Sequence, residues 1–271
     1  MNFKFSEGMT PTEFAVFACE LASHARLETL TRFDLGDEVE NKGGDAAFDP
    51  VTEADRAAEL AMRSLIAERF PEHGISGEEF PDKAPSGRHE WSLDPIDGTR
   101  SFICGLPSWT TLIALLEDGQ PVLGLIDAPV LGETYLGSGE AAWLSRHGGQ
   151  ATIRTSGCRK LPETRLSTTD PFLFEVENET FAAFDRVRGA CRVTRYGHDG
   201  YAYARLAAGS LDLIMECALK PHDYNAVVPL VRAAGGHVGN WAGGTDLSGG
   251  AVIAAATREL YDAVVELIAA E

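Results

Sequence analysis

The sequence predicts a protein that combines an α+β half with an α/β half, and three patterns support this fold class. Two segments with apolar residues at helical spacing come before residue 70, and short apolar runs follow them. Two of these runs, residues 110–117 and 121–127, are joined by Asp118-Gly119, a strong signal for an antiparallel hairpin. Beyond residue 165, apolar runs alternate with helical segments, which is typical of a sheet covered by helices.

The first half is expected to begin with two helices. Thr10-Pro11-Thr12-Glu13 is a capping box with proline at the first helical position, so a helix should follow to about Arg32. A second helix should start at residues 51–55. The charged, glycine-rich segment 33–48 between them is expected to form a loop or hairpin, and metal sites often recruit such loops. Residues 75–77 are expected to form a short strand that leads to Glu78 and Glu79.

The remaining elements follow from the same patterns. Further strands of the first half are expected at residues 134–136, 142–144 and 151–153. In the second half, strands are expected at residues 165–168, 192–196, 211–216, 237–240 and 251–255. Helices are expected at residues 178–187, 199–208, 223–234 and 257–269. We therefore divide the chain into an N-terminal half, residues 1–156, and a C-terminal half, residues 157–271.

The composition limits the partners and the compartment. The 271 residues include 23 Lys plus Arg against 41 Asp plus Glu, which gives a net charge of -18. This balance argues against nucleic acid as a partner, because affinity for its phosphates comes mostly from Lys and Arg. A small phosphorylated substrate stays open, since bound divalent metals can reverse the local charge of a carboxylate site.

Cysteine usage indicates a reducing compartment, and hydropathy indicates neither a secretion signal nor a membrane span. The five cysteines include no Cys-x-x-Cys pair, so a disulfide scaffold is not expected. The first residues lack a basic segment followed by an apolar stretch, and no uninterrupted apolar run reaches a membrane-spanning length. We expect a cytoplasmic protein with no membrane partner.

The segment Asp94-Pro95-Ile96-Asp97-Gly98 is the centre of the predicted site. It follows an apolar run that reads as a buried strand, which Pro95 is expected to end, and Gly98 allows a sharp turn. Asp94 and Asp97 can converge on one side of this turn, and two hard carboxylates suit Mg²⁺. Backbone N–H groups at Gly98, Thr99 and Arg100 could meet a phosphate at the start of a helical turn. Taken alone, the segment is equally typical of an ordinary surface turn.

Three further segments change this interpretation. They are Asp49-Pro50-Val51-Thr52-Glu53-Ala54-Asp55, Gly77-Glu78-Glu79 and Lys220-Pro221-His222-Asp223-Tyr224. With the central segment, their order and spacing resemble the metal-dependent phosphatases of the inositol monophosphatase family. The resemblance implies a layered αβαβα fold with two sheets sandwiched by helices, an active site between the halves, a homodimer and inhibition by Li⁺.

The resemblance also implies roles for individual residues. Glu78, Asp94 and the backbone carbonyl of Ile96 would hold one Mg²⁺ ion. Asp94, Asp97 and Asp223 would hold another. The catalytic group would comprise Glu78, Asp55 and Thr99, with Asp55 pairing with Thr99 to orient the attacking water. Purely structural interpretations remain, because a carboxylate is also favoured in the first turn of a helix, as at Asp55, or as an N-cap, as at Asp199 and Asp223.

The substrate is predicted from the segments that line the expected pocket. Residues 220–224 and 197–203 look like the histidinol-phosphate phosphatase branch of the family, although His198 stands where that branch usually has glycine. Histidinol phosphate carries an ammonium group, which Asp199 and Glu216 could neutralise, while Gly98 and Thr99 meet its phosphate. An inositol or sugar monophosphatase is the alternative. A second alternative is a non-catalytic, metal-binding regulatory protein. A nuclease is a further class of hydrolase, and the acidic composition argues against it.

Overall fold

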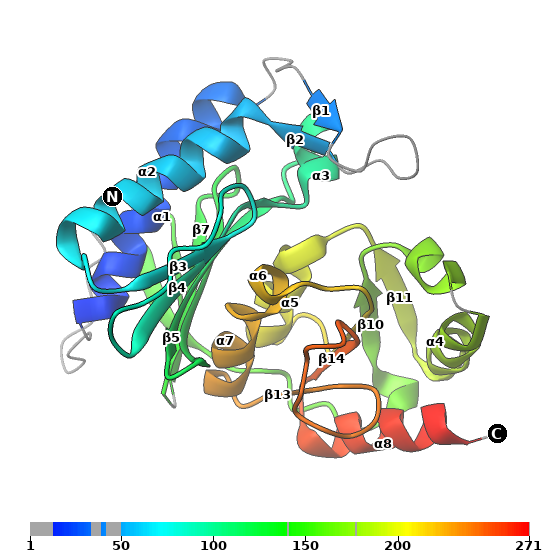
Figure 1. The fold of residues 1–271 in the computed structure, drawn as a ribbon. Coiled ribbons are helices and arrows are strands. Elements are labelled where there is room, and N and C mark those ends of the chain that lie inside the picture. The colour runs from blue at the N-terminus through cyan, green and yellow to red at the C-terminus, as the bar shows by residue number, and fades with distance from the viewer. Residues whose placement is uncertain (1–12, 34–38, 42–49, 140, 177, 271) are drawn as a thin grey trace.

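The computed structural model describes residues 13–33, 39–41, 50–139, 141–176 and 178–270 (Figure 1). The helices are α1 Glu13–Arg32, α2 Glu53–Arg69, α3 Thr99–Ile103, α4 Asn178–Ala190, α5 Asp199–Ala207, α6 Pro221–Tyr224, α7 Val227–Ala233 and α8 Arg258–Ala269, with 3₁₀ turns η1 Leu161–Glu163 and η2 Pro171–Val176. The strands are β1 Val39–Asn41, β2 Pro50–Thr52, β3 Gly74–Gly77, β4 His89–Asp97, β5 Thr110–Glu117, β6 Gln120–Ala128, β7 Glu133–Ser138, β8 Ala141–Arg146, β9 Gly149–Ile153, β10 Arg165–Thr168, β11 Val193–Tyr196, β12 Leu213–Glu216, β13 His237–Gly239 and β14 Val252–Ala255.

The first large sheet has seven strands in sequence order, from β3 to β9. Only β3 and β4 pair in parallel, and every later pair is antiparallel. The predicted hairpin joins β5 to β6, and both of its turn residues, Asp118 and Gly119, have the positive φ angles that such turns require. The antiparallel character predicted for the first half is therefore confirmed.

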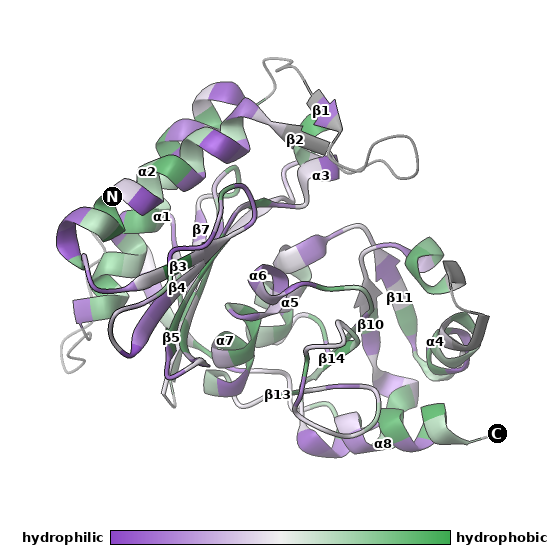
Figure 2. Ribbon diagram, in the orientation of Figure 1, coloured by the Kyte–Doolittle hydropathy of each residue, from purple (hydrophilic) through white to green (hydrophobic). Residues whose placement is uncertain are grey.

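Helices α1 and α2 cover one face of this sheet. Their apolar sides, including Phe17, Leu21 and Met62, pack on Trp91 and Leu125 of the sheet. Both helices carry a mixture of hydrophobic and hydrophilic residues (Figure 2), and α1 also leaves large apolar side chains exposed, Leu27 among them. Burial of one apolar face therefore explains the helical spacing of α2, whereas α1 has apolar residues on its outer side as well.

Helices α5 and α7 cover the opposite face and lie between the two large sheets. Tyr203 and Leu230 belong to a core that includes Ile126 of the first sheet and Ile214 of the second. Gly124 lets α7 approach β6 closely, because a side chain there would overlap the backbone of Ala226. The two halves of the chain therefore share one core.

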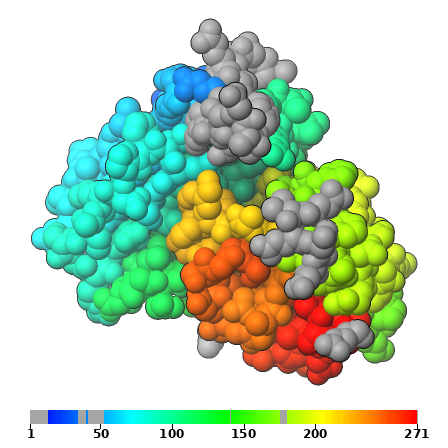
Figure 3. Space-filling model, turned by 45° about the vertical axis from the view of Figure 1, so that its right-hand side comes forward, coloured from blue at the N-terminus to red at the C-terminus, as the bar shows by residue number. Residues whose placement is uncertain are grey.

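The second large sheet has five strands in the order β11-β10-β12-β14-β13. The three strands β11, β10 and β12 are parallel, whereas β14 runs antiparallel to both of its neighbours. Helices α4 and α8 cover its outer face through residues such as Phe184 and Leu260. The molecule thus has five layers, helices, sheet, helices, sheet and helices, and the predicted αβαβα fold is confirmed (Figure 1). The space-filling view shows the N-terminal half, in blue to green, against the C-terminal half, in yellow-green to red (Figure 3).

Three local predictions were wrong. Strand β4 does not end at Pro95 but continues to Asp97, with an irregularity in its pairing to β5 between Asp94 and Asp97. The helix expected at residues 223–234 is divided into α6 and α7. Neither Asp199 nor Asp223 is an N-cap, because His198 and Lys220 hold those positions. Asp199 is the first residue of α5, with a φ of 42°, and Asp223 lies within α6.

Some predictions lie partly or wholly outside the described residues. The capping box at residues 10–13 is one, and most of the segment 33–48 is another, although β1 and β2 pair across that segment as a two-stranded antiparallel sheet. In the part of the chain that the structure describes, no helix combines the length and the apolar character needed to cross a membrane.

Candidate metal and substrate site

The centre of the site is the turn that joins β4 to α3. Gly98 adopts a left-handed conformation with φ of 84°, and a side chain there would meet the carboxylate of Asp199. The hydroxyl of Thr111 donates to the carbonyl of Pro95 at 2.8 Å, and that of Thr110 donates to Asp97 Oδ2 at 2.9 Å. These contacts from β5 fix the turn and direct the Asp97 side chain.

Three carboxylates meet at this turn. Asp94 and Asp97 come from β4 and Asp223 comes from α6, and oxygen atoms of all three lie within 4.8 Å of one another. Asp223 is held by the backbone N–H of Lys220, which donates to its Oδ2 at 2.6 Å. The structure therefore brings together the three aspartates named from the sequence, although Asp223 lies more than 120 residues after the other two.

The electrostatics of this cluster favour a cation. Burial raises the pKa of Asp94 well above its usual value, and the nearby charges of Glu78 and Asp97 raise it further. Burial also raises the pKa of Asp97 and of Asp223, each with added repulsion from neighbouring carboxylates. Among the described residues, no group hydrogen-bonds Asp94 Oδ1, although that atom is buried. Oxygen ligands and an unpaired buried carboxylate oxygen fit a hard divalent cation such as Mg²⁺.

The other predicted catalytic and metal-binding residues surround the cluster. Glu78 follows β3 and lines the same cavity as Asp97 and Asp223. Ile96 is buried, and its carbonyl accepts a hydrogen bond of 3.0 Å from the Thr99 hydroxyl. The Thr99 hydroxyl is therefore held against the central turn through Ile96.

Asp55 lies in the first turn of α2. Its Oδ2 accepts hydrogen bonds from the backbone N–H and the hydroxyl of Thr52, at 2.8 and 2.7 Å. With the Thr52 hydroxyl accepting from Ala54 N, these contacts form a capping box. The helix-start interpretation of Asp55 thus has a structural basis, and its pairing with Thr99 stays a prediction.

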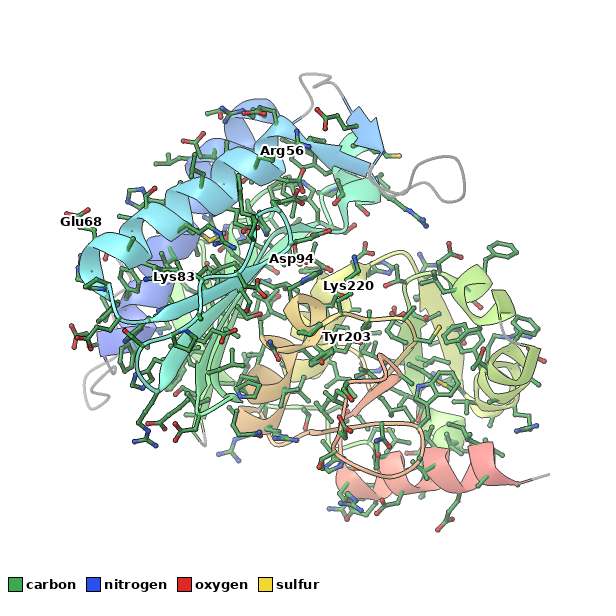
Figure 4. All side chains as sticks on the ribbon, in the orientation of Figure 1. Arg56, Glu68, Lys83, Asp94, Tyr203 and Lys220 are labelled. Atoms are coloured by element: carbon green, nitrogen blue, oxygen red, sulfur yellow. The ribbon has the colours of Figure 1, made fainter. Side chains whose placement is uncertain are left out.

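A cavity of about 260 Å³ adjoins the carboxylate cluster, between the first sheet and the C-terminal half. All four predicted substrate residues line it: Gly98, Thr99, Asp199 and Glu216. Lys220 also lines this cavity. Figure 4 labels Asp94 and Lys220, which both lie where the first sheet meets the C-terminal half. The cluster and the predicted substrate residues therefore belong to one site.

Glu216 is the most enclosed of the cavity's acidic groups. It accepts hydrogen bonds from Thr169 N at 2.7 Å, Thr169 Oγ1 at 3.0 Å and Thr168 Oγ1 at 3.1 Å. Burial nevertheless raises the pKa of Glu216 to about 8. Burial also raises the pKa of Asp199, which the Ser101 hydroxyl and Arg100 partly oppose. These two carboxylates would gain from a cationic group of a ligand.

Three polar residues that line the cavity, Thr169, Lys220 and His222, had no site role in the sequence analysis. Lys220 and His222 belong to the same segment as Asp223, so adjacency in sequence was an available signal. Thr169 had no such signal, because it enters the site only through the pairing of β10 with β12, which places it against Glu216. His198 is not among the residues that line the cavity.

This layered fold, with carboxylates gathered beside a cavity between its halves, is that of a metal-dependent phosphatase. The model of the inositol monophosphatase family matches residues 10–271, and the chain belongs to that family. A solved inositol monophosphatase from Zymomonas mobilis superimposes with a TM-score of 0.81 at 40% identity, covering 94% of this chain and 97% of that one.

Two curated relatives carry further information. A histidinol-phosphatase from Chlorobaculum parvum is 35% identical over 231 residues, which are 84% of this chain and 85% of that protein. The chloroplastic bifunctional phosphatase IMPL2 of Arabidopsis thaliana is 48% identical over 197 residues, which are 72% of this chain. The match spans only 55% of the Arabidopsis protein. This chain is thus similar both to a protein named as a histidinol-phosphatase and to one named as an inositol monophosphatase.

Proposed function

We propose that this chain is a Mg²⁺-dependent phosphatase that hydrolyses L-histidinol phosphate. The observation that carries the proposal is that a second acidic pair, Asp199 and Glu216, lines the same cavity as the carboxylate cluster. Similarity to histidinol-phosphatases, such as that of Chlorobaculum parvum, supports it. In this proposal, the carboxylate cluster holds the metal ions that bind the phosphate of the substrate. Asp199 and Glu216 bind its amine.

The cluster is proposed to hold two Mg²⁺ ions. Glu78, Asp94 and the Ile96 carbonyl would bind one, and Asp94, Asp97 and Asp223 the other, with Asp94 shared. When bound, such ions neutralise phosphoryl oxygens and lower the pKa of water. Thr99 would orient the attacking water with the help of Asp55, while Gly98 and Thr99 contact the phosphate. A bound cation would stabilise the ionised carboxylates, because its charge offsets the burial and the mutual repulsion that raise their pKa values.

The amine is proposed to lie against Asp199 and Glu216. Three hydrogen bonds from Thr168 and Thr169 hold Glu216 in one position, so its free side is preorganised for a cationic group. A neutral polyol brings no positive charge to these two carboxyl groups, whereas an ammonium group could donate charge-assisted hydrogen bonds to them. Such a pocket should therefore discriminate against inositol phosphates.

A comparison of two substrates tests this proposal. We expect a higher kcat/KM for L-histidinol phosphate than for myo-inositol 1-phosphate, measured by phosphate release at one Mg²⁺ concentration. Asp199→Asn and Glu216→Gln should narrow the ratio, since each removes one negative charge that faces the amine. Glu163→Gln changes an exposed carboxylate of η1 and should leave the ratio as in the parent. Faster hydrolysis of the inositol ester by the parent would refute the substrate assignment.

The alternative is an inositol or broader sugar monophosphatase, which the match to the Zymomonas mobilis enzyme favours. In that case Glu216 would accept a hydrogen bond from a substrate hydroxyl. Two properties follow from family membership under either alternative: inhibition by millimolar Li⁺ and assembly as a homodimer. Phosphate release with added LiCl and the molar mass from light scattering test them separately.

A further inference from the structure

Glu59 is a buried carboxylate of α2 that the proposed chemistry does not use. It is 0% exposed and lies one turn after Asp55. Its Oε1 accepts from Arg63 Nε at 2.7 Å, and its Oε2 accepts from the backbone N–H of Glu79 at 2.8 Å. Burial of a carboxylate is costly unless it is paired and hydrogen-bonded, and Glu59 meets both conditions. Both oxygens are therefore committed to fixed partners.

Arg63 extends these contacts to the residues that follow Glu79. Its Nη2 donates to the carbonyl of Phe80 at 3.0 Å, and its Nη1 donates to the carbonyl of Pro81 at 3.1 Å. A guanidinium group presents its donors in a rigid fork, so one Arg63 conformer satisfies all three acceptors. The Glu59-Arg63 pair thus holds the backbone from residue 79 to residue 81 against α2.

Gly77 supplies a contact on the other side of Glu78. A side chain at Gly77 would overlap the carboxylate of Glu59, so the backbone of β3 rests directly on that group. Glu78 stands between Gly77, packed on Glu59, and Glu79, hydrogen-bonded to it. The backbone on both sides of Glu78 is therefore set by one buried side chain.

We propose that Glu59, supported by Arg63, is a positioning residue that holds Glu78 in place for the divalent cation. The role rests on the proposed function, because Glu78 is a proposed ligand of the metal. Groups that hold a ligand from outside the coordination sphere typically change metal affinity or activity by about 10- to 100-fold when they are replaced. Glu59 would position Glu78 by holding the backbone of Gly77 and Glu79 on either side of it, and not by contact with the Glu78 carboxylate.

The test is direct Mg²⁺ binding to metal-stripped protein, measured by calorimetry with MgCl₂. Glu59→Gln keeps the shape of the side chain but weakens its hold on Arg63 and on Glu79 N. We expect Mg²⁺ affinity to fall by about 10- to 100-fold. We also expect kcat to recover at saturating Mg²⁺, because the ligands themselves remain.

Asp212→Asn is the matched control. Asp212 is 1% exposed and accepts from the backbone N–H of Arg165 and from its guanidinium, so it has the same kinds of partner as Glu59. It is not among the residues that line the cavity. This variant should lower the melting temperature while Mg²⁺ affinity stays within about twofold of the parent.

Arg63→Lys provides a second variant should Glu59→Gln not fold. It keeps the positive charge near Glu59 but cannot reach both the Phe80 and Pro81 carbonyls, so a smaller loss of Mg²⁺ affinity is expected. Parental Mg²⁺ affinity in a folded Glu59→Gln or Arg63→Lys protein would overturn the positioning role. An equal loss in Asp212→Asn would also overturn it. Because Mg²⁺ affinity is measured without substrate, these outcomes test the positioning role of Glu59 even if L-histidinol phosphate is not the substrate.

Discussion

The hydroxyl of Thr99 lies at the first residue of α3 and donates to the Ile96 carbonyl. It can still accept a hydrogen bond, as a group that orients water must. Thr99→Ala should lower kcat by about 10²–10⁴-fold with a small change in Mg²⁺ affinity. Thr99→Ser retains the hydroxyl and should keep most of the activity. Asp55→Asn should resemble Thr99→Ala, and additive losses in the double variant would show that the two residues do not act together.

Glu216 gives a pH dependence of stability whose sign can be derived. Burial raises its pKa from 4.5 to about 8, so between these values the folded protein holds a proton that the unfolded chain releases. The contribution of Glu216 is thus fully present below the unfolded pKa and is lost as the pH rises through about 8. In metal-free protein, Glu216→Gln should reduce the fall in melting temperature between these pH values. An identical fall in parent and variant would contradict the assigned environment of Glu216.

At the residue scale, sequence patterns identified the acidic residues that line the site more completely than the polar residues that contact them. Asp94 and Asp97 could be predicted because they precede Gly98, which allows a sharp turn between a strand and a helix. Asp223 depended on a family resemblance, since its local pattern indicates only a helix start. Thr169 could not be predicted, because its contact with Glu216 exists only after two strands distant in sequence have paired.

At the scale of elements, the start of α5 is held against the central turn. The backbone N–H of Gly200 donates to Asp97 Oδ2 at 2.5 Å, and an added Cβ would lie 2.5 Å from that oxygen and 2.8 Å from Thr110 Oγ1. Gly200→Ala should therefore displace Asp97 and weaken Mg²⁺ binding measured by calorimetry. The expected loss is about 10-fold or more, as for other groups that position a ligand.

A second glycine provides the control for this variant. Gly189 lies in α4 and has no atom within 4 Å of the position of an added Cβ. Gly189→Ala should leave Mg²⁺ affinity unchanged and stabilise the fold by up to about 0.5–1 kcal/mol, because alanine is preferred to glycine within helices. Parental Mg²⁺ affinity in Gly200→Ala would contradict the coupling of α5 to the metal site.

Most elements could be predicted from periodicity, and the errors have both local and long-range causes. Within residues 223–234, Pro229 was a local signal for a new helix start, because proline fits the first turn of a helix and breaks its interior. The Asn225 side chain at the division donates to Ser92 of β4 at 3.1 Å, and the Ala226 backbone packs against Gly124 of β6. Pro95 likewise does not end β4, since its carbonyl is held by Thr111 of the neighbouring strand.

At the scale of the whole molecule, the layers place the site where the two halves meet. Asp94 and Asp97 come from the C-terminal end of β4 in the first sheet, whereas Asp223, Asp199 and Glu216 come from the C-terminal half. The residue patterns predicted the element types of each half but not how the halves pack. That arrangement was expected from the family resemblance alone, because it depends on contacts such as those of α7 with both sheets.

A Mg²⁺ titration of phosphate release from L-histidinol phosphate, with parent and Asp94→Asn side by side, tests the central claim most directly. The parent should require Mg²⁺ and lose activity on chelation. Asp94→Asn should lose about 10²–10³-fold or more in kcat and need more Mg²⁺, because a shared ligand has lost its negative charge. Unchanged turnover by the chelated parent, or normal turnover by Asp94→Asn at low Mg²⁺, would contradict the account.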